Sequence, residues 1–465
     1  MPALYDFATW APLLKLVRES NAQALAAPGG YAQGDVGQGS WSVPVRRVSP
    51  PRGQAAQLSD MQEEWDAVEL LRGALVEAGV ERVPFVVECT PQGAATLRLF
   101  GPHPDVEAGY DGPHGGALIL ADDAVPEPWR RLPEPVLDAV RSPSADAGEL
   151  ERVLRERLPD AIGVTEEEIV AAEVRLGITL PEEVKALYRV TRARWEDWST
   201  DDDFAASRHH SESVGFELFG LEHVFVAEPD NRATPWEFAA MEAVATRPDD
   251  SVQRIVGSPG WITIGDSGGG DGIVVDLTPG PCGHLGQVIL LSHEEDIGGV
   301  LLADSLTELI VNGEREEEYR EREELPEVAR INEFAGRSVE AVAHPALEVL
   351  SLGVWDGEPF SLAPVTGLPR LRTLTAYPGT LADPLEIAGL SALEYLRLPY
   401  EEWRTLLDAD AVPRGLLAAS IETSGGGPDH HPLALVALTY EILSLFGRSA
   451  IPVTVLEGDL GPAPD

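Results

Sequence analysis

The chain has 465 residues and carries 78 acidic side chains against 34 basic ones, which gives a formal net charge of −44 at pH 7. Its hydrophobic content of 44% excludes wholesale disorder. At roughly 150 residues per domain, the length predicts about three domains. No apolar run approaches the roughly 20 residues of a membrane helix, and charge interrupts the apolar residues near the N-terminus, unlike a secretory signal. We expect a soluble, cytoplasmic protein that does not bind membranes.

The charge also limits the classes of partner. An excess of negative charge repels phosphate backbones, so we do not expect direct binding to nucleic acid. The same field attracts basic proteins and speeds encounter with them. The alternative reading is that the acidity serves solubility alone.

Residues 1–132 are predicted to form a small α+β domain whose role the sequence does not reveal. A helix is expected over 5–17, and a Gly- and Gln-rich loop over 29–40. After a strand over 41–48, the residues Trp65, Val68, Leu71 and Leu75 keep the spacing of a helix. Further strands are predicted over 83–89, 95–100 and 116–120.

A linker and helix over 133–160 lead to a second predicted domain at 161–313. Thr165 and Glu168 form a capping box, because hydroxyl and carboxylate can each accept a hydrogen bond from an otherwise unpaired amide. Val164 and Ile169 add a hydrophobic staple, and Gly177 is a helix stop. A second helix is expected from Pro181, at the first helical position, with buried residues Val184, Leu187 and Tyr188.

The rest of this domain is predicted to be a sheet and one more helix. An acidic, aromatic loop covers 195–203. Short strands with Gly-rich turns between them predict an antiparallel meander. Ser305 and Glu308 form a second capping box, which opens a helix through Ile310. A charged connector over 314–340 has no assigned binding role. The predicted strands cover 216–219, 261–264, 272–277 and 287–291.

Residues 341–460 contain an internal repeat. Residues 345–352, 369–376 and 391–398 align, with leucines in an L-x-x-L-x-L pattern, and a degenerate fourth copy includes Leu416 and Ile421. A period between 20 and 29 residues is typical of leucine-rich repeats, in which stacking makes one continuous core. We expect a short leucine-rich-repeat-like solenoid, then a helix over 433–445 and a Pro-rich tail.

No catalytic or metal site is predicted. The run Gly265–Gly270 is similar to the serine motif of chymotrypsin-type proteases, but its last residue is Gly rather than Pro and no upstream histidine motif accompanies it. A glycine-rich hairpin turn, with Asp266 and Asp271 capping amides, is the preferred interpretation. The same glycines lack the Lys-Ser/Thr pair of a P-loop. The two cysteines, Cys89 and Cys282, are far apart, so neither a disulfide framework nor a zinc site is indicated. The histidines do not converge, so no metal and no cofactor are expected.

Three blocks of the second domain occur in the order found in one known superfamily. The segment from about 163 to 311 resembles the SUKH superfamily of fungal cell-wall-assembly regulators and bacterial immunity proteins. One departure is the segment Thr191–Trp195 with its acidic loop, where the family commonly has an Asn-Gly turn. The blocks are Thr165–Ile169 with Glu173, Leu176-Gly177, Leu180–Glu183 and Leu187-Tyr188; Ile264–Gly272 with Asp276-Leu277; and Leu302–Ile310.

The resemblance implies an α+β domain without catalysis that binds another protein. The leading hypothesis is a bacterial immunity protein whose partner is a basic toxin domain, such as a nuclease. Two alternatives are an intracellular regulatory adaptor unrelated to toxins and an enzyme that uses Cys89, His103 and His114. Since aromatic anchors ringed by carboxylates suit a basic partner, the expected contact residues are Trp195, Asp197, Trp198, Asp201, Asp202 and Asp203, and then Asp266 and Asp271.

Overall fold

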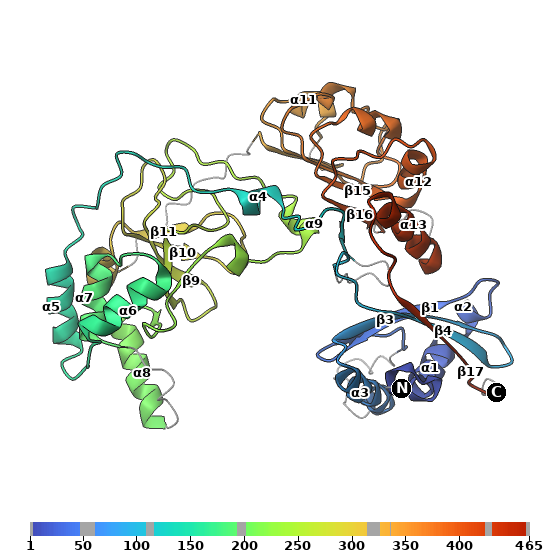
Figure 1. Ribbon diagram of the computed structural model, residues 1–465, viewed down its shortest axis with the longest axis horizontal. Coiled ribbons are helices and arrows are strands. Elements are labelled where there is room, and N and C mark those ends of the chain that lie inside the picture. Colours follow the sequence, from blue (N-terminus) through green and yellow to red (C-terminus); the bar gives the residue numbers. More distant parts are fainter. Residues whose placement is uncertain are drawn as a thin grey trace. The chain divides into compact units, whose positions relative to one another are not determined.

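The computed structural model describes residues 3–46, 61–107, 116–192, 201–313, 326–334, 336–423 and 430–461, with the backbone alone over 201–207. The chain divides into two compact units, which we describe separately (Figure 1). Unit 1 consists of Met1–Ala124, Arg330–Pro345 and Leu350–Asp465, and unit 2 of Val125–Ala329 and Ala346–Val349. Helices accompany antiparallel strand pairs in both units, which confirms a mixed α+β protein.

Unit 1 contains an antiparallel sheet with the strand order β17-β4-β3-β1-β2. Helices α1 (Phe7–Ser20) and α3 (Gln62–Ala78) lie on one side of it (Figure 1). Trp10 and Leu71 from these helices are fully buried beside Phe85 of the sheet. The strands are β1 (Ala32–Gly37), β2 (Trp41–Ser42), β3 (Arg82–Cys89), β4 (Ala94–Phe100) and β17 (Val453–Asp459).

For this sheet two predictions are wrong and a third is confirmed only in part. The Gly-rich segment predicted as a loop contains β1, and the strand predicted over 41–48 is shortened to β2 in the described residues. At Gly34 an added Cβ would lie 2.5 Å from the carbonyl oxygen of Ser42. This glycine therefore permits close approach of the next strand and does not mark a turn. The predicted tail also contains a strand, β17. Its pairing was not predicted because its partner β4 lies more than 300 residues earlier in the chain.

A second sheet, whose strands belong mostly to unit 1, has the order β12-β13-β14-β15-β16-β5. Strands β14, β15 and β16 pair in parallel, with Thr373 opposite Tyr395 and Tyr395 opposite Ala418. The strand predicted over 116–120 is present as β5 (Leu118–Ile119), but it pairs with β16 and not with the N-terminal strands. There it covers an edge that would otherwise be open. The strands are β12 (Val328–Ile331), β13 (Val349–Leu352), β14 (Thr373–Ala376), β15 (Tyr395–Pro399) and β16 (Ala418–Glu422).

Short helices connect the parallel strands, and two longer helices follow them. The helices η5 and η6 lie in the connections before β14 and β15. Helix α13 contributes Val436 to a small cluster with Phe100 of β4. The helices are α11 (Val339–Val342), η5 (Ala363–Val365), η6 (Pro384–Gly389), α12 (Tyr400–Asp408) and α13 (Pro432–Leu445), and the N-terminal region adds η1 (Ala3–Tyr5) and α2 (Ala22–Leu25).

Unit 2 is built on an antiparallel sheet in the order β11-β10-β9-β8-β6, with β7 also paired to β8. The predicted meander is confirmed. Four helices bury one side of the sheet, and they contribute Leu154, Ile169, Leu187 and Leu309 to one cluster with Ile264 of the sheet. The strands are β6 (Glu217–Leu218), β7 (Phe225–Val226), β8 (Trp261–Asp266), β9 (Gly272–Asp276), β10 (Gln287–Leu291) and β11 (Val300–Ala303). The four helices are α5 (Ala147–Arg157), α6 (Glu166–Leu176), α7 (Glu182–Val190) and α10 (Leu306–Asn312), and shorter ones are α4 (Glu127–Arg130), η4 (Pro229–Asn231) and α9 (Trp236–Ala239).

The predicted helix caps of unit 2 are largely confirmed. Thr165 Oγ1 accepts a hydrogen bond from the Glu168 amide, and the Glu168 carboxylate accepts one from the Thr165 amide at 2.7 Å. Gly177 ends α6 at φ +68°. The second capping box is half formed, because Ser305 caps α10 while the Glu308 carboxylate accepts from Asp304 instead. Among the described residues, no helix is both long and apolar enough to cross a bilayer.

Candidate functional site

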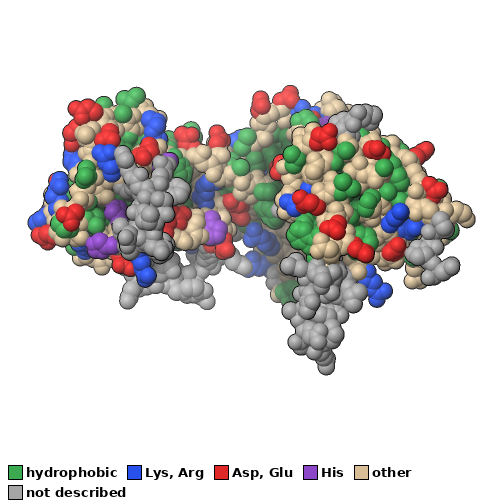
Figure 2. All heavy atoms as spheres, turned by 90° about the horizontal axis from the view of Figure 1, so that it is seen from below, with side chains coloured by type: hydrophobic (Ala, Val, Ile, Leu, Met, Phe, Trp, Pro, Cys, Tyr) green, Lys and Arg blue, Asp and Glu red, His purple; other side chains and the backbone are tan. Residues whose placement is uncertain are grey.

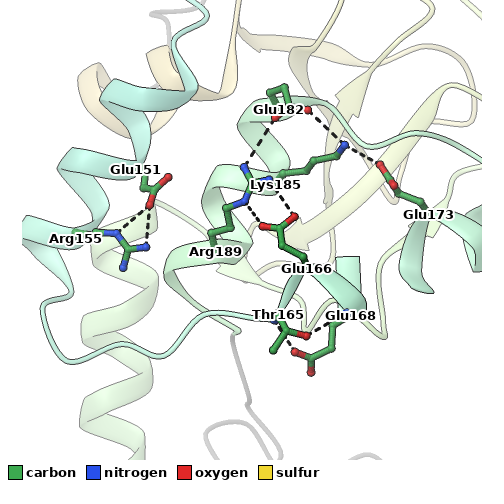
Figure 3. Close-up of polar contacts among 9 residues, drawn as sticks. All are labelled: Glu151, Arg155, Thr165, Glu166, Glu168, Glu173, Glu182, Lys185 and Arg189. Atoms are coloured by element: carbon green, nitrogen blue, oxygen red, sulfur yellow. Dashed lines mark hydrogen bonds and ion pairs between the residues drawn. The ribbon is translucent and has the colours of Figure 1, made fainter. Parts of the chain in front are cut away.

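The charged face of unit 2 lies along α6 and α7, where ion pairs join the two helices (Figure 3). Arg189 lies 2.6 Å from Glu166, and Lys185 lies 2.9 Å from Glu173. Hydrogen bonds from these two cations lower the pKa of both carboxyl groups. Arg192 similarly approaches Glu168 at 3.3 Å. Because each of these cations already has a carboxylate partner, the network leaves little unpaired positive charge for a ligand, and as surface ion pairs these contacts add little to stability.

The outward face of α6 carries a different signal. Glu167, Val170, Ala171 and Val174 are all exposed, with Val170 56% and Val174 78% accessible to solvent. Their spacing places them on one face of the helix. Ile169 lies on the opposite face and is buried in the core. Val170, Ala171 and Val174 form an apolar row that the fold does not cover, and such a row is a candidate contact surface for another protein. We call these three residues together with Glu167 the α6 stripe.

The predicted acidic, aromatic loop is only partly described. Trp195, Asp197 and Trp198 lie outside the described residues. Asp201, Asp202 and Asp203 do not belong to a loop, because their backbone forms the first turn of α8 (Asp201–Val214). This part of the prediction is therefore corrected, while the proposed contact with a partner remains a prediction.

Asp266 and Asp271 are brought together by the hairpin between β8 and β9. The Asp266 carboxylate accepts hydrogen bonds from the amides of Gly268 at 2.7 Å and Gly270 at 3.2 Å, so it caps the turn as expected. Asp271 does not cap the turn. It accepts from the amide and ring Nδ1 of His293, at 3.0 and 2.8 Å, and these bonds lower the pKa of Asp271.

Neither the hairpin serine nor the cysteine is arranged for catalysis. Ser267 Oγ accepts from the Gly269 amide, and no bond to a histidine joins it in the described part of the chain. Burial raises the pKa of the Cys89 thiol, the opposite of what a nucleophile needs. His103 is bonded to Ser449 at 2.8 Å, and His114 lies outside the described residues. Where the structure describes the chain, no three His, Cys, Asp or Glu side chains converge as a metal site would require.

Sequence reasoning missed the α6 stripe and one buried carboxylate. The stripe had a signal, since α6 carries apolar residues on two faces and the hydrophobic staple accounts only for Ile169. Asp276 is fully buried, accepts from the Thr278 amide at 2.7 Å and Gln287 Nε2 at 2.9 Å, and has a pKa raised to about 6 by burial. It has no access to a ligand, so its role is structural.

The capped α6–α7 pair, the meander and α10 all lie in a segment that matches one known family. Residues 163–312 match the SMI1 / KNR4 family (SUKH-1). This segment is a SUKH domain. The family expected from the sequence is therefore confirmed for this part of the chain.

Three curated fungal proteins are similar to parts of this chain. The cell wall biosynthesis/cell cycle regulator smi1 of Schizosaccharomyces pombe is 33% identical over 95 residues, 17% of this chain and 19% of that protein. The glucan synthesis regulatory protein of Neurospora crassa is 28% identical over 107 residues, 22% of this chain and 19% of that protein. A KNR4/SMI1 homolog of Yarrowia lipolytica is 45% identical over 49 residues, 10% of this chain and 7% of that protein.

These relatives bear on the function of the SUKH domain. The chain spans at most about a fifth of their length. Their names describe regulators and not toxin-neutralising proteins or enzymes. They favour the regulatory alternative over the toxin-immunity hypothesis, and a toxin partner gains no support from them.

Proposed function

We propose that this protein is a non-enzymatic regulatory adaptor that binds other proteins through its SUKH domain. The observation that carries the proposal is the α6 stripe, in which two valines remain exposed beside a carboxylate. Burying a valine side chain contributes about 1.5–3 kcal/mol, so a partner that covers both gains affinity that the fold does not use. The regulatory names of the fungal relatives support the same function.

The chemistry of the surface favours a basic partner. The chain carries a net charge of −44, and the cations of α7 are paired with carboxylates of α6. Acidic side chains are spread over the face of the molecule shown in Figure 2, with fewer basic ones between them. Such a surface accelerates association with a positively charged protein. The predicted contact residues at 195–203, together with Asp266 and Asp271, are proposed to extend the contact.

We also infer that the repeats at 341–460 form a short leucine-rich-repeat-like solenoid that offers a second protein-binding surface. In support, each of the four copies contributes one strand, and the three later strands pair in parallel at spacings of 22 and 23 residues. The first leucines of the copies are buried and would form one row of a stacked core. They are Leu347, Leu371, Leu393 and Leu416. The other proposed divisions are an N-terminal domain at 1–132, a linker at 133–160 and the charged connector.

The test is capture of partners by the tagged full-length protein in an extract of its own organism, followed by mass spectrometry. The double variant Val170→Glu/Val174→Glu is compared with the wild type and with Val140→Glu, whose side chain is 64% exposed elsewhere in unit 2. We expect basic proteins to bind the wild type and the control but not the double variant. Capture of the same proteins by all three would refute a role for α6, and capture of a toxin domain would restore the immunity hypothesis.

A further inference from the structure

The C-terminal strand β17 lies at the edge of the N-terminal sheet. It pairs with β4 along its whole length, from Val453 opposite Phe100 to Asp459 opposite Ala94, without a register shift. It stands at the end of the strand order, and among the described residues no strand pairs with its other side. Edge strands with open backbone groups are templates for pairing with another chain.

The hydrogen bonds at the two ends of β17 fix which backbone groups face outward. The Gly101 amide donates to the Pro452 carbonyl at 2.8 Å, and the Leu460 amide donates to the Gly93 carbonyl at 2.8 Å. In an antiparallel pair, hydrogen-bonded residues alternate with residues whose backbone groups point the other way. Thr454, Leu456 and Gly458 therefore bond to β4. The outward amides and carbonyls are those of Val453, Val455, Glu457 and Asp459.

The side chains of β17 leave this edge unprotected. Leu456 packs against the core beneath the sheet, and Gly458 lies against Phe7 of α1. Val453 and Val455 are 39% and 52% exposed. Neither lysine, proline nor a bulge, the usual means of blocking an edge, occurs between residues 453 and 459. The fold thus presents an unbulged, partly apolar strand to solvent.

Charge indicates which strand fits there. Glu457 is exposed and makes no ion pair in the described part of the chain, and Asp459 follows it on the same edge. Glu457 and Gly458 also line a hollow of 550 Å³ together with Glu88 and Thr96. A second copy of this chain would itself carry a net charge of −44 and would be repelled. A cationic segment is favoured instead.

We propose that β17 binds an extended, basic segment of a partner protein as an added antiparallel strand. Main-chain hydrogen bonds to the four outward residues supply affinity, and Val453, Val455 and Glu457 select apolar and then basic side chains. This surface lies in unit 1, so the inference does not rest on the function proposed for the SUKH domain.

The test uses the full chain and a fluorescein-labelled peptide, Lys-Thr-Arg-Thr-Val-Thr-Val, in fluorescence anisotropy titrations at physiological salt. Its arginine is placed to lie opposite Glu457. One control peptide has the same sequence with N-methyl groups on alternate amides, which keeps the charge but removes the hydrogen-bond donors. The other replaces Lys and Arg by Glu. We expect saturable binding of the first peptide and at least tenfold weaker binding of both controls.

Two protein variants make the same test from the other side. Val455→Pro removes an amide that faces outward, so the ladder to β4 keeps all its bonds. Glu457→Lys reverses the charge at the edge without changing the backbone. It tests peptide binding even if the proline variant fails to fold. Each is expected to weaken peptide binding at least tenfold. Equal affinity for the N-methylated peptide, unchanged affinity in Glu457→Lys, or no binding to the wild type would overturn the proposal, as would a dimer in sedimentation that Val455→Pro dissolves.

Discussion

Glu183 on α7 caps the N-terminus of α10 through two hydrogen bonds from one residue, Thr307. Its Oε1 accepts from the Thr307 amide at 2.8 Å and from Thr307 Oγ1 at 2.5 Å. Thr307 is the second residue of α10, whose amide has no partner within the helix. The contact joins the first and last blocks of the SUKH domain, 124 residues apart. Burial raises the pKa of Glu183, because removing the charged carboxylate from water costs free energy. The two hydrogen bonds from Thr307 offset part of this cost.

Replacing Glu183 by Ala is expected to destabilise the SUKH domain by about 2 kcal/mol, because the buried Thr307 amide loses its acceptor while the hydroxyl keeps only the Asp146 carbonyl, 3.0 Å away. Glu182→Ala, at the neighbouring exposed position, should cost less than about 0.5 kcal/mol. Hydrogen-exchange mass spectrometry of the full chain measures both, through the protection of peptides from α7 and α10. Equal protection in the two variants would show that Thr307 finds another acceptor.

Cap chemistry explains which parts of this fold the sequence could predict. Thr165, Glu168 and Gly177 act on residues only three or four positions away, so α6 was predicted with its start and stop. Strand partners are not local. Gly34 was wrongly assigned to a loop. It lies in a strand because a side chain there would collide with Ser42 and Phe85, and the sequence alone does not reveal that these residues are its neighbours. The same reason hides β17, whose partner strand lies at the other end of the chain.

The buried carboxylate of Asp276 predicts a pH dependence of stability. Its pKa rises from an ordinary value of 3.8 to about 6 on folding, because burial outweighs the bonds from Thr278 and Gln287. The folded state therefore binds this proton more tightly than the unfolded state. The resulting stabilisation is present below about pH 4 and is lost as the pH rises through about 6.

The variant Asp276→Asn cannot titrate, so it isolates this contribution. The unfolding free energy of the wild type minus that of the variant should fall by about 2.4 kcal/mol between about pH 4 and pH 7. Urea titrations followed by tryptophan fluorescence measure it. Repeating them in about 0.5 M salt screens the surface charges but not the buried one. A difference that stays constant with pH, or rises, would contradict a raised pKa.

The candidate site was less predictable than the fold, because a contact surface is recognised by which side chains are exposed to solvent. Val170 and Val174 could each have been core residues, and only the packed structure shows that Ile169 and Ala172 fill that role. Asp271 shows the same limit. Its bond to His293 joins residues 22 positions apart, and no local spacing rule distinguishes it from Asp266.

Gly163 is expected to be intolerant of any side chain. A Cβ at this position would lie 1.9 Å from the carbonyl oxygen of Arg189, where the neighbouring Val164 amide donates to Tyr188 at 2.8 Å. Gly163→Ala must push the start of α6 away from α7 and should cost about 2–3 kcal/mol. The control Gly148→Ala meets only Asp146 Oδ1, at 3.4 Å, and should be neutral or slightly stabilising. Exchange protection of α7 that falls equally in both variants would refute this steric argument.

For the repeat segment, we predict which strands lose stability when one buried leucine is replaced. Leu374 of β14 is fully buried between the equally buried Leu350 and Leu396 of the adjoining copies. Leu374→Ala should lower stability by about 3 kcal/mol, whereas Leu385→Ala, at a side chain 41% exposed, should cost less than about 1 kcal/mol. If the copies stack as repeats, each contacts only its neighbours. Exchange protection should then fall in β13 and β15 as well as in β14, with little change in the N-terminal strands. A loss confined to β14, or shared equally by all of unit 1, would show that these strands do not form a repeat solenoid.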